Sequence, residues 1–142
     1  MSPCYSGYYS FCTINLLTLL PHPIMRTTQE VAHQLVAFCR QGQFIEAQQE
    51  LYAEDAVSLQ PANALFEAHL QGRASIIARE KRLQQAGPVR AVEVTDAVVA
   101  GNHFSLAMTL EITLPGPEIR LRSEIGVYEV QNGQIVLEQF FF

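Results

Sequence analysis

The stretch of sequence that decides the fold lies near the C-terminus and reads Val127-Tyr128-Glu129-Val130-Gln131-Asn132-Gly133-Gln134-Ile135-Val136. Asn-Gly between two β-rich runs is the strongest short-range signal for a β-hairpin, because both residues accept the positive φ angles of a type I′ turn. The pattern therefore predicts two final antiparallel strands, 119–130 and 135–142, joined by a two-residue turn at Asn132-Gly133.

More strands are expected before this hairpin. Apolar and polar residues alternate from Phe104 to Thr113, with Phe104, Leu106, Met108, Leu110 and Ile112 on one side. That period of two is typical of a strand with one buried face. The segment 89–95 is rich in β-branched residues, 96–100 leads to a turn at Gly101-Asn102, and 57–59 is expected to be a short strand.

Three helices are expected in the first half of the chain. Thr27 and Glu30 form a capping-box pair before an apolar stripe at helical spacing, and Gly42 supplies a C-terminal stop. A second helix is predicted over 44–51 and a third over about 73–85, separated by a loop or partly helical lid over 61–71. Helices followed by a meander of strands indicate an α+β fold with the helices on one sheet face.

Composition excludes several classes of protein. The 142 residues suit one domain, and 49% apolar against 16% charged residues is typical of a globular chain. The net charge of -5 comes without a basic face, so no nucleic-acid partner is expected. Arg79, Lys81 and Arg82 on the third helix are interpreted as a solvated helix face.

Cysteine and histidine usage predicts no disulfide framework and no metal site. Three cysteines are an odd number without a Cys-x-x-Cys pair, and the four histidines are scattered. We therefore expect no metal and no other cofactor, and a reducing cytoplasm as the location.

Residues 1–24 differ from the rest because they contain no Lys, Arg, Asp or Glu. The segment lacks the positive region and cleavage site of a signal peptide, and its apolar run is too short to cross a bilayer, so no membrane association is expected. Pro21 and Pro23 separate it from Met25. We expect a non-core extension over 1–24, with Met25 as the hypothetical true start, and a domain over 25–142. An uncleaved tail or an atypical export signal are the alternatives.

Four motifs in this order and spacing resemble a known family: Leu51-Tyr52-Ala53-Glu54-Asp55-Ala56-Val57-Ser58, Gly72-Arg73-Ala74-Ser75-Ile76, Val99-Ala100-Gly101-Asn102-His103-Phe104-Ser105 and the hairpin sequence quoted above. The chain resembles the SnoaL-like branch of the nuclear transport factor 2-like superfamily, from residue 27 to the end. The resemblance implies a cystatin-like cone, in which a curved antiparallel sheet wraps around N-terminal helices and leaves a pocket at the open end. It also implies frequent homodimers, expected here through the outer sheet face, but no single activity.

A two-residue turn would fix which residues share a face of the last two strands. One face would carry Leu121, Ser123, Ile125, Val127, Val136, Glu138, Phe140 and Phe142. The other would carry Arg120, Arg122, Glu124, Tyr128, Leu137, Gln139 and Phe141. The first face is mostly apolar and is expected to meet the helices, while the second is expected to meet solvent or a partner subunit.

Glu138 is the one carboxylate on the predicted inner face. A buried carboxyl without a partner has a raised pKa and can serve as a general acid or base near neutral pH. The alternative is a Glu138 that hydrogen-bonds a tyrosine or a backbone group. In the family that the chain resembles, many members carry a pocket histidine at this place, so a histidine mechanism does not carry over.

The other candidate ligand contacts come from several elements. They are Tyr52 at the end of the second helix, Phe66 and His69 in the expected lid, Met108 and Phe140 on the apolar strand faces, and Glu124 in reserve. Glu124 is predicted to face outward, and a β-bulge would reverse that assignment.

Two functions remain open at this point. One is a non-catalytic module that binds a small apolar molecule or forms a dimer. The other is a cofactor-independent isomerase, cyclase or dehydratase that uses Glu138 as its acid–base group. A second polar group within hydrogen-bond reach of Glu138 would favour the enzyme. A cavity filled by Met108, Phe140 and Phe142 would favour the module.

Overall fold

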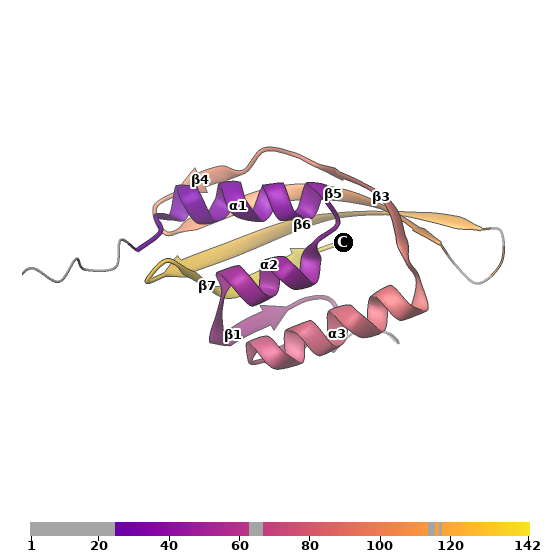
Figure 1. The fold of residues 1–142 in the computed structure, drawn as a ribbon, viewed down its shortest axis with the longest axis horizontal. Helices are drawn as coiled ribbons and strands as arrows, with labels where there is room; N and C mark the ends of the chain where they lie inside the picture. Colours follow the sequence, from indigo (N-terminus) through magenta and orange to yellow (C-terminus); the bar gives the residue numbers. More distant parts are fainter. Residues whose placement is uncertain (1–24, 63–66, 114–115, 117) are drawn as a thin grey trace, which may run out of the picture.

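The computed structural model describes residues 25–62, 67–113, 116 and 118–142 (Figure 1). The hypothesis about the start of the chain concerns residues 1–24 and lies outside these ranges. The helices are α1 (Thr28–Arg40), α2 (Phe44–Leu51) and α3 (Arg73–Ala86). The strands are β1 (Tyr52–Leu59), β2 (His69–Gln71), β3 (Val89–Val94), β4 (Val98–Ala100), β5 (His103–Thr113), β6 (Ile119–Gln131) and β7 (Gln134–Phe141). None of the helices in these ranges is long and apolar enough to span a membrane.

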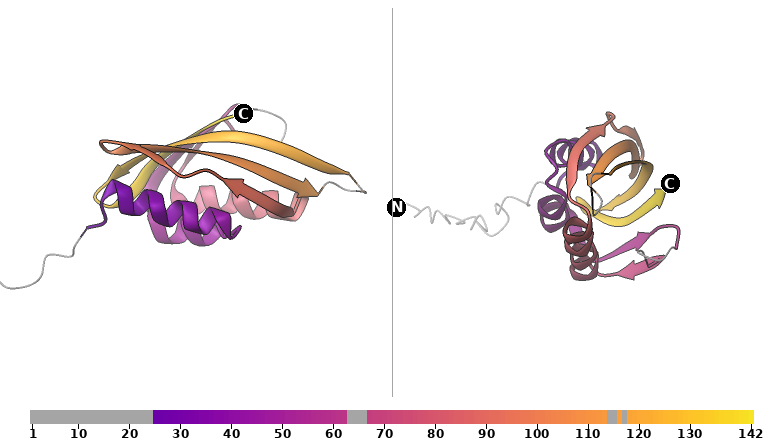
Figure 2. Two further views of the ribbon diagram at one scale, coloured as in Figure 1. Left: turned by 90° about the horizontal axis from the view of Figure 1, so that it is seen from above. Right: turned by 90° about the vertical axis from the view of Figure 1, so that its right-hand side faces the viewer.

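The strands form one curved sheet, and the helices lie together on one of its sides (Figures 1 and 2). The strand order is β2-β1-β7-β6-β5-β3, with β4 beside β5. This arrangement confirms the α+β cone. The expectation of an antiparallel sheet is wrong at one place, because β1 and β7 are parallel. Parallel neighbours need a long crossover connection, and here the chain between them includes α3 and the β3–β6 strands.

The helical layer follows the sequence closely. The Thr27 hydroxyl accepts a hydrogen bond from the Glu30 N–H at 3.2 Å, and the Thr27 N–H donates to the Glu30 carboxylate at 2.7 Å. This reciprocal pair is the predicted capping box. Helix α2 has the predicted bounds, and α3 extends one residue beyond the predicted end.

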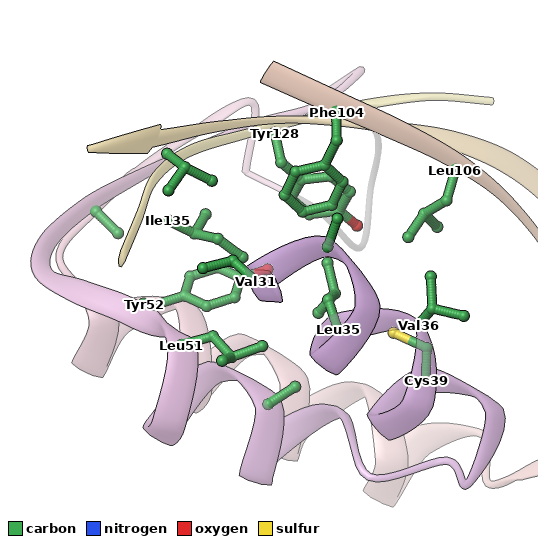
Figure 3. Packing of buried hydrophobic residues seen from close by; sticks show 14 of the residues in the cluster. Val31, Leu35, Val36, Cys39, Leu51, Tyr52, Phe104, Leu106, Tyr128 and Ile135 are labelled. Atoms are coloured by element: carbon green, nitrogen blue, oxygen red, sulfur yellow. The ribbon is translucent and has the colours of Figure 1, made fainter. Parts of the chain in front are cut away.

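The core lies between α1, α2 and the concave side of the sheet (Figure 3). Val31 and Leu35 from α1 and Leu51 from α2 are buried in one cluster with Phe104 and Leu106 from β5. Burial of each large apolar side chain contributes roughly 1.5–3 kcal/mol. The alternation predicted for β5 is therefore confirmed, since its apolar side builds the core.

The hairpin between β6 and β7 has the predicted turn. Asn132 and Gly133 have φ angles of 50° and 73°, and Gln131 pairs directly with Gln134. Two positive φ angles are what a type I′ turn requires.

Beyond the turn, the register differs from the prediction. Val130 pairs with Ile135, whereas Glu129 pairs with Leu137, so Val136 is an extra residue in β7. Such a β-bulge shifts all later pairs by one residue. Tyr128 consequently lies opposite Glu138. The prediction that Val127 and Glu138 share a face is wrong, because Val127 pairs with Gln139.

The bulge corrects the predicted faces of β6 and leaves those of β7 largely intact. Glu138 faces the helices, as expected, and is buried. On β6 the faces are exchanged: Tyr128 and Glu124 are buried inside, while Ile125 is on the convex side and 51% exposed. Glu138 is therefore not the one inward carboxylate of these two strands, because Glu124 is also inside.

The expected lid is in part a strand. His69 belongs to β2, which pairs with the end of β1 and extends the sheet at its edge. The residue is exposed and is placed by main-chain pairing rather than by a closing loop. Phe66 lies outside the described residues.

Candidate functional site

A cavity of about 720 Å³ lies between the helices and the concave side of the sheet. We call it the cone cavity. Five of the sequence-predicted contacts line it, namely Tyr52, Met108, Glu124, Glu138 and Phe140. His69 does not line it. Apolar side chains from α1, α2, α3 and β5 form much of its wall, among them Leu35, Phe44, Leu83 and Leu110.

Glu138 stands at the inner end of the cone cavity and makes two strong contacts. The Tyr52 hydroxyl donates to Glu138 Oε2 at 2.5 Å, and Arg79 Nη2 donates to Glu138 Oε1 at 2.9 Å. A hydrogen bond to a tyrosine is the alternative that the sequence left open for this carboxylate. The contacts come from β1 and α3, so Glu138 connects β7 to its neighbouring strand and to a helix.

Arg79 is the site residue that the sequence interpretation missed. It is buried on the inner side of α3, where Nη1 also donates to the Ser58 hydroxyl at 2.8 Å. The solvated-face interpretation is therefore wrong for this residue. Ile76, Arg79 and Leu83 follow at i, i+3 and i+7, which places the arginine on the apolar stripe of the helix. This spacing in the sequence is the feature that indicates a buried position for Arg79.

Burial and Glu138 together fix the protonation state of Tyr52. Burial and the adjacent Glu138 carboxylate raise the pKa of Tyr52 well above its ordinary value. Its hydroxyl is therefore neutral and serves as a donor to Glu138. The Glu138 carboxylate thus receives one neutral and one charged donor, which compensates for its burial.

Glu124 lies on β6 nearer the opening of the cone cavity. Burial raises the pKa of this carboxyl, although Arg122 beside it acts in the opposite direction. Arg122 Nη2 is 2.7 Å from Glu124 Oε2, and its guanidinium lies 4.0 Å from the centre of the Phe142 ring. Arg122 therefore has a cation–π contact as well as a carboxylate partner.

Glu80 is a second carboxyl with a raised pKa, and it lines the same cavity from α3. Burial is the main cause of the shift, and a hydrogen bond from Gln84 Nε2 at 3.1 Å acts against it. The cone cavity therefore contains two carboxyl groups that hold their protons to higher pH than ordinary glutamates do.

Tyr128 forms part of the wall of the cone cavity. Its ring stacks on Phe104 with centroids 4.8 Å apart (Figure 3). It also meets the edge of Phe140 at 6.2 Å. Burial raises the pKa of the Tyr128 hydroxyl well above its usual value, so it stays protonated.

The site offers acid–base and hydrogen-bonding chemistry. Within the described ranges, His, Cys, Asp and Glu side chains form no group that could hold a metal ion. Cys39 also lines the cavity, but burial raises the pKa of its thiol to about 12, which leaves it a poor nucleophile.

Comparisons with known proteins agree with this fold. A model of the SnoaL-like domain matches residues 26–142. A Mesorhizobium loti protein described as a SnoaL-like polyketide cyclase is 25% identical, with a TM-score of 0.75 over 82% of this chain and 99% of that one. None of the curated proteins is significantly similar to this chain.

Two more distant structures share the fold. A Xanthomonas campestris protein of unknown function with a cystatin-like fold is 15% identical, with a TM-score of 0.70 over 81% of this chain and 89% of that one. A Catenulispora acidiphila protein with a ketosteroid isomerase-like fold is 19% identical, with a TM-score of 0.64 over 82% and 87%. Because the domain model spans almost all of the described residues, the chain belongs to the SnoaL-like domain family.

Proposed function

We propose that the chain binds one small, largely apolar molecule inside the cone cavity. The observation that carries the proposal is the cavity itself, about 720 Å³ in volume. Small-molecule sites usually measure about 300–1,000 Å³ and combine apolar walls with a few polar groups. Met108, Phe140 and Phe142 line this space without filling it, so the side chains alone do not close the core.

The polar groups of the cavity support an oriented ligand rather than a nonspecific apolar one. Glu138 and Tyr52 stand at the inner end, and Glu124 and Arg122 stand nearer the opening. A ligand with one polar end would find hydrogen-bonding groups at both ends of an apolar chamber.

A second candidate is a cofactor-independent enzyme of the isomerase, cyclase or dehydratase kind. Glu124 favours it, because a cavity carboxyl with a raised pKa is suited to move a proton near neutral pH. Tyr52 and Arg79 lie within hydrogen-bond reach of Glu138, which is the arrangement expected to favour an enzyme. They already bind both oxygens of Glu138, however, so Glu124 is better suited to carry the proton. The likeness to a protein described as a polyketide cyclase also supports this candidate.

A thermal-shift screen with small apolar carbonyl compounds tests the binding proposal. A ligand that binds only the folded protein raises the melting temperature in proportion to RT ln(1 + [L]/Kd). We expect hits with the unmodified protein and expect Phe44→Trp, which puts bulk into the cavity wall, to weaken them. A complete absence of hits across compounds that fit the cavity would contradict the proposal.

Turnover separates the two candidates. Compounds that bind are incubated with the protein and with Glu124→Gln, and products are measured by mass spectrometry and proton–deuterium exchange. Exchange at carbon that Glu124→Gln abolishes supports the enzyme. Binding without exchange in either protein supports the non-catalytic module.

We also propose that two copies of the chain pair through the convex side of the sheet. Leu121, Ile125 and Phe141 are large apolar side chains exposed there, and Ile125 lies directly opposite Phe141 across β6 and β7. Apolar groups clustered on a sheet face are typical of a subunit interface. Light scattering should give the mass of a dimer, and Ile125→Lys should give a monomer. A monomeric parent protein would contradict the proposal.

A cytoplasmic location is a further proposal. Its support is the odd number of cysteines and the buried, free Cys39. Such usage is typical of a reducing compartment. Fractionation of the producing cells tests it, and recovery of the protein outside the cytoplasm would contradict it.

A further inference from the structure

The Tyr128 hydroxyl is a polar group in the wall of the cone cavity that stands apart from the Arg79–Glu138 pair. The residue is 2% exposed and lines the cone cavity. Within the described ranges its hydroxyl has no hydrogen-bond partner, whereas the Tyr52 hydroxyl is bound to Glu138. The hydroxyl oxygen is accessible from the cone cavity, so its proton is available to an occupant. An occupant that accepts a hydrogen bond would take the place of water at this donor.

Gly126 explains where this hydroxyl sits. A Cβ atom at position 126 would lie 2.6 Å from the Tyr128 hydroxyl oxygen and 2.8 Å from its ring. Any side chain there would push the tyrosine away. Glycine inside a strand weakens it, and it often marks a place where another group must approach the backbone closely. Here the group that approaches is the Tyr128 side chain.

The ring that carries the hydroxyl is held from two sides. Phe104 stacks on one face, and Phe140 meets it edge-on. Figure 3 shows the Tyr128 ring lying along Phe104 between the sheet and the helices. A donor on a fixed ring loses little conformational entropy when a ligand binds, which favours its use in recognition.

We propose that the Tyr128 hydroxyl donates a hydrogen bond to a carbonyl oxygen of the bound molecule, and that Gly126 sets this specificity by leaving room for the hydroxyl. The proposal rests on the proposed binding function and adds the chemical class of the ligand. A carbonyl oxygen is favoured because it accepts the phenol proton and has no proton of its own that would need a second acceptor in an apolar cavity. Glu124 lies on the same inward side of β6, on the other side of Gly126, and can add a second contact when it is protonated.

The test uses two molecules of nearly equal shape. In 2-acetylnaphthalene a ketone oxygen occupies the place that a CH₂ group takes in 2-isopropenylnaphthalene. Dissociation constants are measured by equilibrium dialysis for the unmodified protein and for Tyr128→Phe, which removes the hydroxyl and keeps the ring. We expect the unmodified protein to prefer the ketone. Tyr128→Phe should reduce the ratio of the two constants about fivefold, the value of one neutral hydrogen bond.

Two further variants sharpen the result. Gly126→Ala keeps the Tyr128 hydroxyl but displaces it, so it should also reduce the preference for the ketone. Thr109→Val removes a hydroxyl on β5 that does not line the cone cavity, so a fall in preference confined to Tyr128→Phe and Gly126→Ala is expected. Circular dichroism confirms that each variant is folded, and Tyr128→Phe decides the matter if Gly126→Ala does not fold.

The outcomes separate this inference from the function on which it rests. If neither naphthalene binds the unmodified protein, both the binding proposal and this inference fail for ligands of this class. If both bind and Tyr128→Phe leaves their ratio unchanged, binding stands and the role of Tyr128 is wrong. An equal loss in Thr109→Val and Tyr128→Phe would also overturn it, because the effect would then not depend on a hydroxyl inside the cavity.

Discussion

The two buried arginine–glutamate pairs of the cone cavity are built differently. Arg79 and Glu138 have side-chain exposures of 5% and 1%, and Tyr52 and Ser58 complete their hydrogen bonds. Arg122 and Glu124, with 19% and 6%, stand nearer the opening, and the arginine lies against the terminal Phe142 ring. The first pair joins α3 to β7, whereas both members of the second come from β6.

The two pairs therefore have different roles. A pair that connects separate elements and has its hydrogen bonds completed holds the inner end of the cone together. Arg122 and Glu124 both belong to β6, so their pair connects no separate elements, and the Glu124 carboxyl has a raised pKa. The inner pair should therefore matter most for stability and the outer pair most for ligands and for pH.

The largest effect is expected when the inner pair is broken. Arg79→Met leaves the Glu138 carboxylate buried without its cation, which should cost about 3–5 kcal/mol of unfolding free energy. Urea denaturation measures the change. Arg82→Met is the matched control, because the Arg82–Glu67 pair is on the surface of the same helix and is worth about 1 kcal/mol or less. Similar losses in the two variants would remove the distinction.

An intermediate effect is expected at Tyr52. Tyr52→Phe removes one hydrogen bond to a buried carboxylate and leaves the ion pair, so the loss should be about 1.5–3 kcal/mol. The same denaturation experiment measures it. A double-mutant cycle with Glu138→Gln should give a clear coupling energy, since the two side chains are in direct contact. Additive losses would show that this contact contributes little.

The smallest effect is expected at the outer pair, and it depends on pH. Burial raises the folded-state pKa of Glu124 above the ordinary 4.5. Between those two pKa values the folded state binds more protons than the unfolded state, so stability falls as pH rises through that window. Glu124→Gln lacks this group, so its stability relative to the parent protein should increase as pH rises from 4.5. Melting temperatures at a series of pH values test this, and parallel profiles would contradict it.

The sequence predicted those features that depend on local pattern. The capping box at Thr27, the alternation of β5 and the two positive φ angles at Asn132-Gly133 each arise within a few residues. The prediction that Glu138 faces the helices is also confirmed, because side chains after the bulge in β7 alternate as expected.

Features that depend on packing between distant elements were harder to predict. No glycine or other turn residue within β7 indicates the bulge at Val136. The bulge reverses the predicted sides of Tyr128 and Glu124. Arg79 was interpreted by its charge, although its helical position placed it inside. Its burial depends on Glu138, which is 59 residues away in the chain.

The extra residue in β7 has a consequence for how this chain is compared with its relatives. A homologue that lacks Val136 would pair β6 with β7 regularly and still place Tyr128 opposite Glu138, because the bulge absorbs the extra residue. A homologue of the same length without the bulge would instead bring Val127 opposite Glu138, and the inward side chains of β6 would change to the convex surface. Two proteins with identical residues in β6 would then present different side chains to the cavity, so alignments of β7 should count residues from the bulge rather than from the turn.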